Sequence, residues 1–236
     1  MHIRNNFNER TVVHPEHYEF IDSPLAGVSR MMLERAGAEV ARATSIVRYQ
    51  PGSGYSAHTH GGGEEILVLA GVFSDEHGDY PAGTYLRNPP GTSHQPFSRN
   101  GCTLLVKLWQ FAQDDTTQCV IHTQQAQWLP GQVDGLSVLP LHEHKGVHTA
   151  LVRWAPNTQF SAHMHPSGEE ILVLEGTFYD EHGAYPAHSW LRNPKGSTHT
   201  PFTLNDGALI YVKTGHIGAH LMGDRFIHQP TETSSA

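Results

Sequence analysis

Short apolar or alternating runs recur along the whole chain, and turn-forming segments separate them. The clearest runs read ILVL, SIVRY, LLVKLW and ALIYVK, and they are rich in residues that favour strands. Between them stand PGSG, EHGDYPAG, NPPG, EHGAYPA and NPKG, whose proline and glycine residues form turns. Only SRMMLERAGAEV resembles an amphipathic helix. The pattern therefore predicts an all-β chain arranged as sandwiches or barrels.

The pattern is repeated within the chain. Residues 58–83 read HTHGGGEEILVLAGVFSDEHGDYPAG, and residues 163–188 read HMHPSGEEILVLEGTFYDEHGAYPAH. The likeness extends outward, because VVHPEHYEF at 12–20 matches VIHTQQAQW at 120–128. The repeated unit is about 105–110 residues long, a normal length for a domain. We therefore expect two domains, residues 1–118 and residues 119–236, which meet near the polar segment AQDDTTQ.

The end of the chain carries a third, shorter echo. FIHQ at 226–229 resembles VVHP and VIHT, and it is read either as a closing edge strand or as a chance likeness. The final TETSSA is small and polar, so we expect it to fray.

Composition places the chain among ordinary globular proteins, since 38% of its residues are hydrophobic and 16% are charged. The net charge of -8 and the lack of a basic cluster argue against a nucleic-acid surface. No apolar run approaches the roughly 20 residues of a membrane helix, and the N-terminus lacks the apolar core of a secretory signal. The two cysteines, Cys102 and Cys119, form no CxxC pair. A cytoplasmic protein is the simplest reading.

The positions of several histidines indicate candidate metal ligands. Side chains two residues apart share one face of a strand, so His58 and His60 point the same way. Glu64 keeps their parity, provided that the GGG between them carries no bulge, and His94 follows the turn NPPG. The second repeat carries the corresponding residues His163, His165, Glu169 and His199. Three imidazoles and one carboxylate suit zinc, iron, nickel or manganese, so each repeat predicts one metal site.

Other histidines carry a weaker signal. His77 and His182 fall in the turn DEHG and are expected to be solvated. HEHKGVH contains His142, His144 and His148, but no carboxylate and no PxGxxH follow at the right distance. Surface or edge positions are expected for His216, His220 and His228.

The doubled acid in GEE leaves one carboxylate on the opposite face of the strand. Glu65 and its counterpart Glu170 must face away from the histidines and should have a cation nearby. Arg48/Arg153 and Lys107/Lys213 recur in both repeats and are the candidate partners. Contacts to a substrate are open to Tyr80/Tyr185, Arg48/Arg153 and Arg87/Arg192, although the last pair is also read as bracing the turn.

These motifs match a known family. Gly52-SGYSA-His58-T-His60-GGG-Glu64-EILVLA-Gly71 resembles the first cupin motif, and Asn88-PPGTS-His94 resembles the second. The sequence pattern GEEILVLxGxFxDEHGxYPA most closely resembles the ChrR-like cupin family, which includes the cupin domain of the anti-sigma factor ChrR. The resemblance covers both halves and implies a bicupin, two tandem jelly-roll β-barrels with a metal near each barrel mouth. It also implies zinc ligation by His58, His60, Glu64, His94, His163, His165, Glu169 and His199.

The resemblance leaves several functions open. ChrR holds a sigma factor with an N-terminal zinc domain that contains a CxxC pair, and this chain has no such pair, so sigma-factor binding is not expected. The first hypothesis is a metal-binding bicupin, with zinc expected first and iron second, and with room for a small molecule in the barrels. A metal-dependent dioxygenase of small diketones or phenolic compounds is the main alternative, followed by a sensor module without catalysis. Exposed barrel edges leave homo-oligomerisation open.

Overall fold

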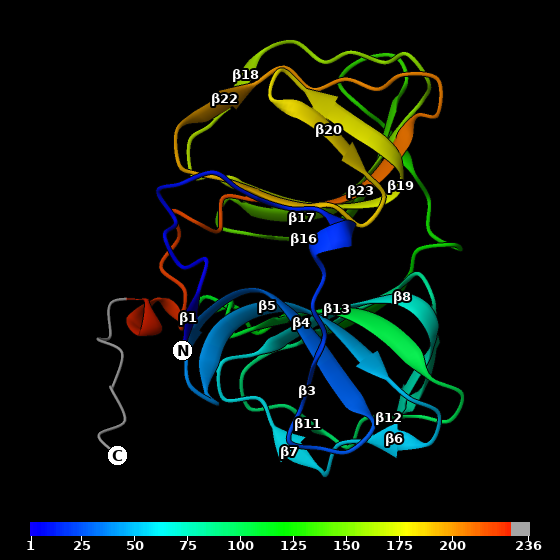
Figure 1. Cartoon of the computed structure of the whole chain (residues 1–236), viewed down its shortest axis with the longest axis vertical. Coiled ribbons are helices and arrows are strands. Elements are labelled where there is room, and N and C mark those ends of the chain that lie inside the picture. The colour runs from blue at the N-terminus through cyan, green and yellow to red at the C-terminus, as the bar shows by residue number, and fades with distance from the viewer. Residues whose placement is uncertain (228–236) are drawn as a thin grey trace. The chain divides into compact units, whose positions relative to one another are not determined.

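The computed structural model describes residues 1–227, and its regular secondary structure is almost entirely β-strand, which confirms the all-β prediction (Figure 1). Two short 3-10 helices, η1 (Pro15–His17) and η2 (Asp224–Phe226), are the helical segments among these residues. No helix in this part of the chain is long and apolar enough to cross a membrane. The strands divide between two compact units, each built around one repeat.

The first unit contains Met1–Asn5, Glu19–Gln124 and the described part of His220–Ala236. Its strands are β1 (His2–Ile3), β3 (Ile21–Asp22), β4 (Val28–Gly37), β5 (Ala41–Tyr49), β6 (Ser53–Gly54), β7 (His58–Thr59), β8 (Glu64–Asp75), β9 (Gly78–Pro81), β10 (Thr84–Asn88), β11 (Ser93–His94), β12 (Phe97–Ser98), β13 (Cys102–Leu108) and β14 (Cys119–His122). The main antiparallel sheet has the order β1-β4-β5-β13-β8-β10-β14, and short ladders of β7 with β11 and of β6 with β12 complete a jelly-roll barrel.

The second unit contains Asn6–Tyr18 and Gln125–Ala219. Its strands are β2 (Thr11–Val13), β15 (Leu129–Pro130), β16 (Leu136–His144), β17 (Val147–Trp154), β18 (His163–His165), β19 (Glu169–Asp180), β20 (Gly183–Pro186), β21 (Trp190–Asn193), β22 (Ser197–His199) and β23 (Ala208–Thr214). The sheet order β15-β16-β17-β23-β19-β21-β2, with the ladder of β18 and β22, repeats the design of the first unit.

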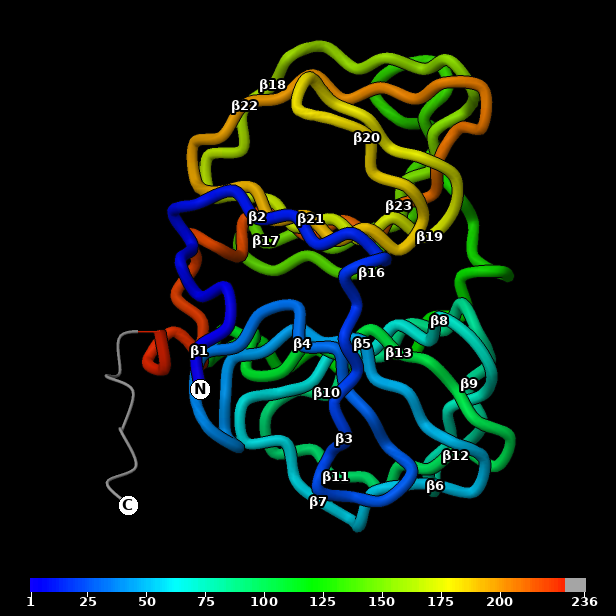
Figure 2. Tube along the Cα trace, viewed as in Figure 1, coloured from blue at the N-terminus to red at the C-terminus, as the bar shows by residue number. Residues whose placement is uncertain are grey.

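A strand near the start of each repeat joins the sheet of the other repeat. β2 belongs to the first repeat in sequence but pairs with β21 of the second unit, beside which it runs in Figure 2. β14 begins the second repeat but pairs with β10 of the first unit. A cut between residues 118 and 119 separates the two repeats in sequence, and independent folding of the domains 1–118 and 119–236 stays a prediction.

Apolar side chains fill the interior of each barrel. The first core contains Val28, Val47, Tyr49, Ile66, Val68, Phe73, Tyr80, Leu86, Cys102, Leu104 and Val106. The second contains Trp154, Ile171, Val173, Phe178, Tyr185, Leu191, Ala208 and Ile210. The central strand of each unit, β8 or β19, contributes several side chains to the core. The same strand begins with the glutamate of the predicted metal site, so the packed core fixes the position of that glutamate.

The segment SRMMLERAGAEV is not a helix. It forms most of β4 and the bend that leads to β5. β4 pairs with β5 along nearly its whole length and with β1 and β3 at its other edge, so backbone pairing outweighs the helical propensity of the sequence. A shift of register between Met32 and Glu34 explains why the apolar residues do not simply alternate.

The two cysteines, Cys102 and Cys119, are both free thiols. In FIHQ, Phe226 closes the helix η2 and packs inward, whereas the last two residues of that echo, with the TETSSA tail, lie outside the described residues.

Candidate metal centres

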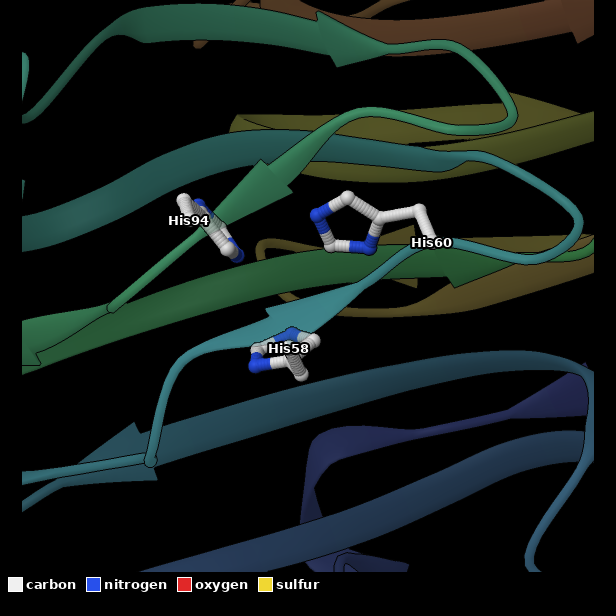
Figure 3. A group of neighbouring side chains, drawn as sticks. All are labelled: His58, His60 and His94. Carbon is white, nitrogen blue, oxygen red and sulfur yellow. The ribbon is translucent and has the colours of Figure 1, made fainter.

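The histidines of each repeat come together on a short two-stranded ladder. β7 pairs with β11 so that His58 lies opposite His94, and His60 follows directly after β7. In the second unit β18 pairs with β22, which places His163 opposite His199. Figure 3 shows the imidazoles of the first group gathered around one space, with two from β7 and its end and one from β11. The same local pairing therefore builds both groups.

Each group is compact enough to hold one ion. In His58, His60 and His94, one nitrogen of each ring lies within 4.8 Å of the others. The ring centroids of this group are 4.7–5.1 Å apart. The second group, formed by His163, His165 and His199, meets the same limit, with centroids 4.7–5.0 Å apart. These are the only such groups among residues 1–227, so HEHKGVH forms none within that range.

The glutamate of each motif lies beside the imidazoles. Oε2 of Glu64 is 3.5 Å from Nε2 of His60 and 3.5 Å from Nε2 of His94. In the second unit, the carboxylate of Glu169 is 3.5 Å from Nε2 of both His165 and His199. Strand parity had assigned the first glutamate of GEE to this side, and the two carboxylates do point there.

Asparagines on the neighbouring strands steady these carboxylates. Nδ2 of Asn88 donates to Oε2 of Glu64 at 3.4 Å, and Nδ2 of Asn193 donates to Oε2 of Glu169 at 3.0 Å. The contacts follow from register, because each asparagine lies directly opposite its glutamate in the sheet. Neither asparagine is distinguished in the sequence by its residue type, although both occur in the repeated segment LRNP.

Buried aspartates support the last histidine of each group. Oδ2 of Asp75 lies 3.4 Å from Nδ1 of His94, and Tyr80 donates its hydroxyl to Oδ1 of the same aspartate at 3.0 Å. The second unit repeats this arrangement. There Asp180 lies 3.6 Å from Nδ1 of His199 and accepts from Tyr185 at 2.6 Å. A carboxylate on the far nitrogen fixes the tautomer that presents Nε2 to a metal.

The first histidine of each group is oriented by the backbone. Nδ1 of His58 lies 2.9 Å from the carbonyl oxygen of Ser56, and Nδ1 of His163 lies 3.0 Å from that of Ser161. A carbonyl oxygen only accepts, so the hydrogen resides on Nδ1 and the lone pair on Nε2. Both rings therefore offer Nε2 as a ligand atom.

The electrostatics of the first group favour neutral imidazoles and a protonated acid. Burial, helped by repulsion from His94 and His58, lowers the pKa of His60 to about 3. Burial raises the pKa of Glu64 to about 7, against the hydrogen bond from Asn88. Nε2 of His60 and Nε2 of His94 are buried and form no hydrogen bond with residues 1–227. Buried nitrogen lone pairs without a donor fit a cation, so the side chains match a divalent metal.

The second group differs in one respect. Burial lowers the pKa of His199, but the carboxylate of Asp180 beside Nδ1 and the charge of Glu169 outweigh burial and raise the pKa above its ordinary value. Arg10 adds a further partner, since its Nη2 lies 3.1 Å from Oδ2 of Asp180. The two sites therefore share their ligand geometry but not their proton affinities.

A cavity of about 330 Å³ opens onto the first group. The histidines and Glu64 form one part of its lining, and Tyr49, Phe73 and Leu104 form part of its apolar wall. Arg30, Arg35 and Glu39 line it as well. A space of this size suits a small molecule, and it places such a molecule next to the candidate ligands.

The second carboxylate of GEE faces the other side of the strand, as predicted, but its cation differs in part from the expected one. Oε1 of Glu65 lies 3.6 Å from Nε of Arg87, and Lys107 stands directly opposite Glu65 on β13. Arg87 also pairs with Asp115 at 2.8 Å. Arg48 is exposed, and its Cζ lies 3.7 Å from the centroid of the Phe20 ring, so it is not a partner of this acid.

The corresponding acid of the second unit, Glu170, lies directly opposite the expected Lys213 on β23 and has further partners. Glu170 accepts from Nε1 of Trp190 at 3.0 Å, and its Oε2 lies 3.1 Å from Nε2 of His216. The expectation that His216 lies at the surface is wrong, because the side chain is completely buried. Nothing in its sequence neighbourhood, KTGHIG, distinguishes it from the exposed His220. Arg153 is exposed and stacks on Trp128.

The remaining predicted residues take structural positions. Arg87 and Arg192 are buried, and Arg192 donates to the carbonyl oxygen of Asn6 at 2.9 Å, which agrees with a bracing role. His77 and His182 are exposed in their turns, as expected. His228 lies outside the described residues.

Comparison with known proteins identifies the family. The model of the ChrR cupin-like domain matches residues 8–112 and again 116–218. The chain belongs to this cupin family. No curated protein matches it. Both halves of the chain are therefore cupin domains, and the bicupin architecture expected from the motifs is confirmed.

Solved structures share the fold at low sequence identity. A candidate dioxygenase from Nostoc punctiforme has a TM-score of 0.67 at 15% identity, covering 94% of this chain and 85% of that one. Bacillus subtilis oxalate decarboxylase has a TM-score of 0.60 at 14% identity, covering 86% and 76%. The Escherichia coli pirin YhhW, solved in complex with nickel(II), has a TM-score of 0.61 at 14% identity, covering 87% and 99%. At these identities the likeness shows the fold alone.

Proposed function

We propose that this bicupin holds one divalent metal ion in each barrel. The ligands are His58, His60, Glu64 and His94 in the first barrel, and His163, His165, Glu169 and His199 in the second. The observation that carries the proposal is the approach of three imidazole nitrogens within 4.8 Å, with a carboxylate 3.5 Å from two of them, in both units. Zinc is our first expectation and iron the second, because both accept this mixture of nitrogen and oxygen ligands.

The surrounding side chains support the same reading. Asp75 and Asp180 set the orientation of one imidazole in each group, and backbone carbonyls set another. Partners of this kind, placed behind the ligand atoms, are characteristic of metal sites in proteins. A bound metal would supply Lewis acidity to a small molecule beside it.

A second candidate function, metal-dependent oxygenation, is favoured by the cavity beside the first site. Its wall combines apolar side chains such as Phe73 and Leu104 with the candidate ligands, so it would exclude bulk water and place a diketone or phenolic compound next to the ion. A sensor module without catalysis would need no such space. Oxygen uptake by iron-loaded protein, measured with small diketones and phenolic acids, separates these two functions.

Metal analysis of the full chain tests the main proposal. Protein purified without chelators should contain roughly two metal ions, and His94→Ala and His199→Ala should each lose one of them. His77→Ala and His182→Ala alter exposed turn histidines in the same two repeats, so they are the matched controls and should keep both ions. Metal content near zero in the unaltered protein, or two ions retained by His94→Ala, would overturn the proposal.

A further inference from the structure

We propose that the first barrel binds a small carboxylic acid, whose carboxylate is held by Arg30 and Arg35, and that the second barrel does not. The inference deepens the proposed function and depends on it only for the end of the ligand that faces the metal. The carboxylate end depends on two arginines of β4 that lie outside the predicted metal site.

The two arginines line the same cavity as the candidate metal ligands. Arg30 and Arg35 both come from β4, whose neighbour β5 contributes Val47 and Tyr49 to the wall. A molecule in this space would thus meet the imidazoles at one part of its surface and guanidinium groups at another. The volume of about 330 Å³ limits it to a small compound.

Arg35 is only partly used by the fold. Its side chain is 5% exposed, and its Nη2 donates to the backbone oxygens of Ala38 and Glu39 at the tip of the β4–β5 hairpin. That contact braces the hairpin but occupies one nitrogen of the guanidinium. Burial and the nearby charge of Arg30, against the charge of Glu39, lower the pKa of Arg35.

Arg30 has no structural task of this kind. Its Nε is buried and forms no hydrogen bond with residues 1–227. Within the same residues, neither Arg30 nor Arg35 forms an ion pair with an acidic side chain, and the acids of the cavity lining are the exposed Glu39 and the candidate metal ligand Glu64. The charge of Glu39 acts on Arg35, but the buried Nε of Arg30 has no acceptor, and a buried donor without an acceptor is costly.

A carboxylate fits these donors. Guanidinium groups present parallel N–H bonds that match the two oxygens of a carboxylate, and such bonds strengthen away from bulk water. Glu39 would oppose a more highly charged anion, so a ligand with a single carboxylate is favoured.

The second barrel lacks both arginines at the equivalent positions. Val47 and Val152 are equivalent positions of the two repeats; Arg30 lies opposite Val47, whereas Val138 lies opposite Val152. Ala43 and His148 are likewise equivalent; Arg35 lies opposite Ala43, whereas Glu143 lies opposite His148. A neutral and an acidic residue thus replace two cations, which predicts that only one barrel recognises an anion.

Calorimetric titration of the full chain tests this inference. Pyruvate and benzoate are the probes, each compared with its uncharged methyl ester, in metal-free and in zinc-loaded protein. At least one acid should bind ten-fold or more tightly than its ester, with one site per chain. Arg30→Met should weaken that acid by roughly ten-fold or more and leave the ester unchanged. Arg35→Lys keeps a charge for the hairpin but removes the planar fork, so it should weaken the acid by a smaller factor.

The matched control is Arg153→Met, which removes an exposed arginine of the second unit that stacks on Trp128. It should bind both probes as the unaltered protein does. Equal binding of acids and esters, or unaltered binding by Arg30→Met, would overturn the inference. Arginine-dependent binding to protein that never takes up metal would leave the inference standing and refute the proposed metal sites instead.

Discussion

Oδ2 of Asp75 lies 3.4 Å from Nδ1 of His94, and the second repeat reproduces the pair as Asp180 and His199 at 3.6 Å. Both aspartates end the long central strand of their barrel, and both are buried. A buried carboxylate in this position orients the ring and increases the basicity of the opposite nitrogen. The pair therefore connects the predicted metal site with the hairpin that follows the central strand.

Replacing either aspartate should weaken metal binding in its own barrel. Asp75→Asn and Asp180→Asn keep the size of the side chain but remove the charge that steadies the imidazole. We expect metal affinity at the affected site to fall by about 10–100-fold, with the fold retained. Competition with a coloured chelator would measure the affinity, and circular dichroism would check the fold. Asp79→Asn, an exposed change in the same hairpin, is the control. Unaltered affinity in both variants would refute the supporting role.

The two acids of GEE should give different phenotypes. Glu64→Gln removes a predicted metal ligand, so metal content should fall by roughly one ion per chain while thermal stability of the metal-free protein stays close to that of the parent. Glu65→Gln removes the charge that faces Nε of Arg87, and we expect it to lower the free energy of unfolding by about 1–3 kcal/mol without loss of metal.

Metal analysis and urea denaturation of the two variants would be compared side by side. Loss of metal in Glu65→Gln, with none in Glu64→Gln, would show that the assignment of faces along β8 is inverted.

Protons should leave the first site when metal binds. Because burial raises the pKa of Glu64 to about 7, its carboxyl group is protonated in metal-free protein at pH 6 and ionised at pH 8. Ligation requires the ionised form, so zinc binding should release about one more proton from this group at pH 6 than at pH 8. Calorimetry in buffers of different ionisation enthalpy measures the number, with His199→Ala confining zinc to the first barrel. An equal release at pH 6 and at pH 8 would contradict the assignment.

Much of the fold and of the candidate site follows from local sequence. The repeat fixes two similar units, and the alternation of a strand places Glu64 rather than Glu65 on the side of the histidines. What local patterns do not contain is the partner of each strand. The exchange of β2 and β14 between the repeats depends on pairing across the whole chain. Likewise Asp75 was missed because only the three-dimensional hairpin brings it to His94. His216 was expected at the surface because its burial against Glu170 depends on a contact between distant segments, which produces no hydrophobic periodicity in the sequence around it.

One difference between the repeats concerns the loop that carries the metal motif. The backbone N–H of Trp109 donates to the carbonyl oxygen of Gly63 at 3.1 Å, and Gly215 makes the same bond to Gly168 at 3.1 Å. Trp109 adopts a left-handed conformation, with φ of 61°, that suits the glycine of the second repeat better. Its ring covers Gly62 and contacts Phe226 edge-on, with ring centroids 5.3 Å apart.

The second repeat has Ser167 where the first has Gly62, so the smaller residue occurs in the repeat that carries the tryptophan. A side chain added at Gly62 would overlap the indole of Trp109, which also lines the cavity. We therefore expect Gly62→Ser to lower the free energy of unfolding by about 1–3 kcal/mol. In a Trp109→Gly background the same change should cost almost nothing, because the ring that it meets has gone. Urea denaturation of the four proteins gives the coupling energy directly. Equal costs in the two backgrounds would mean that Gly62 is required for its backbone and not for the space it leaves to the tryptophan.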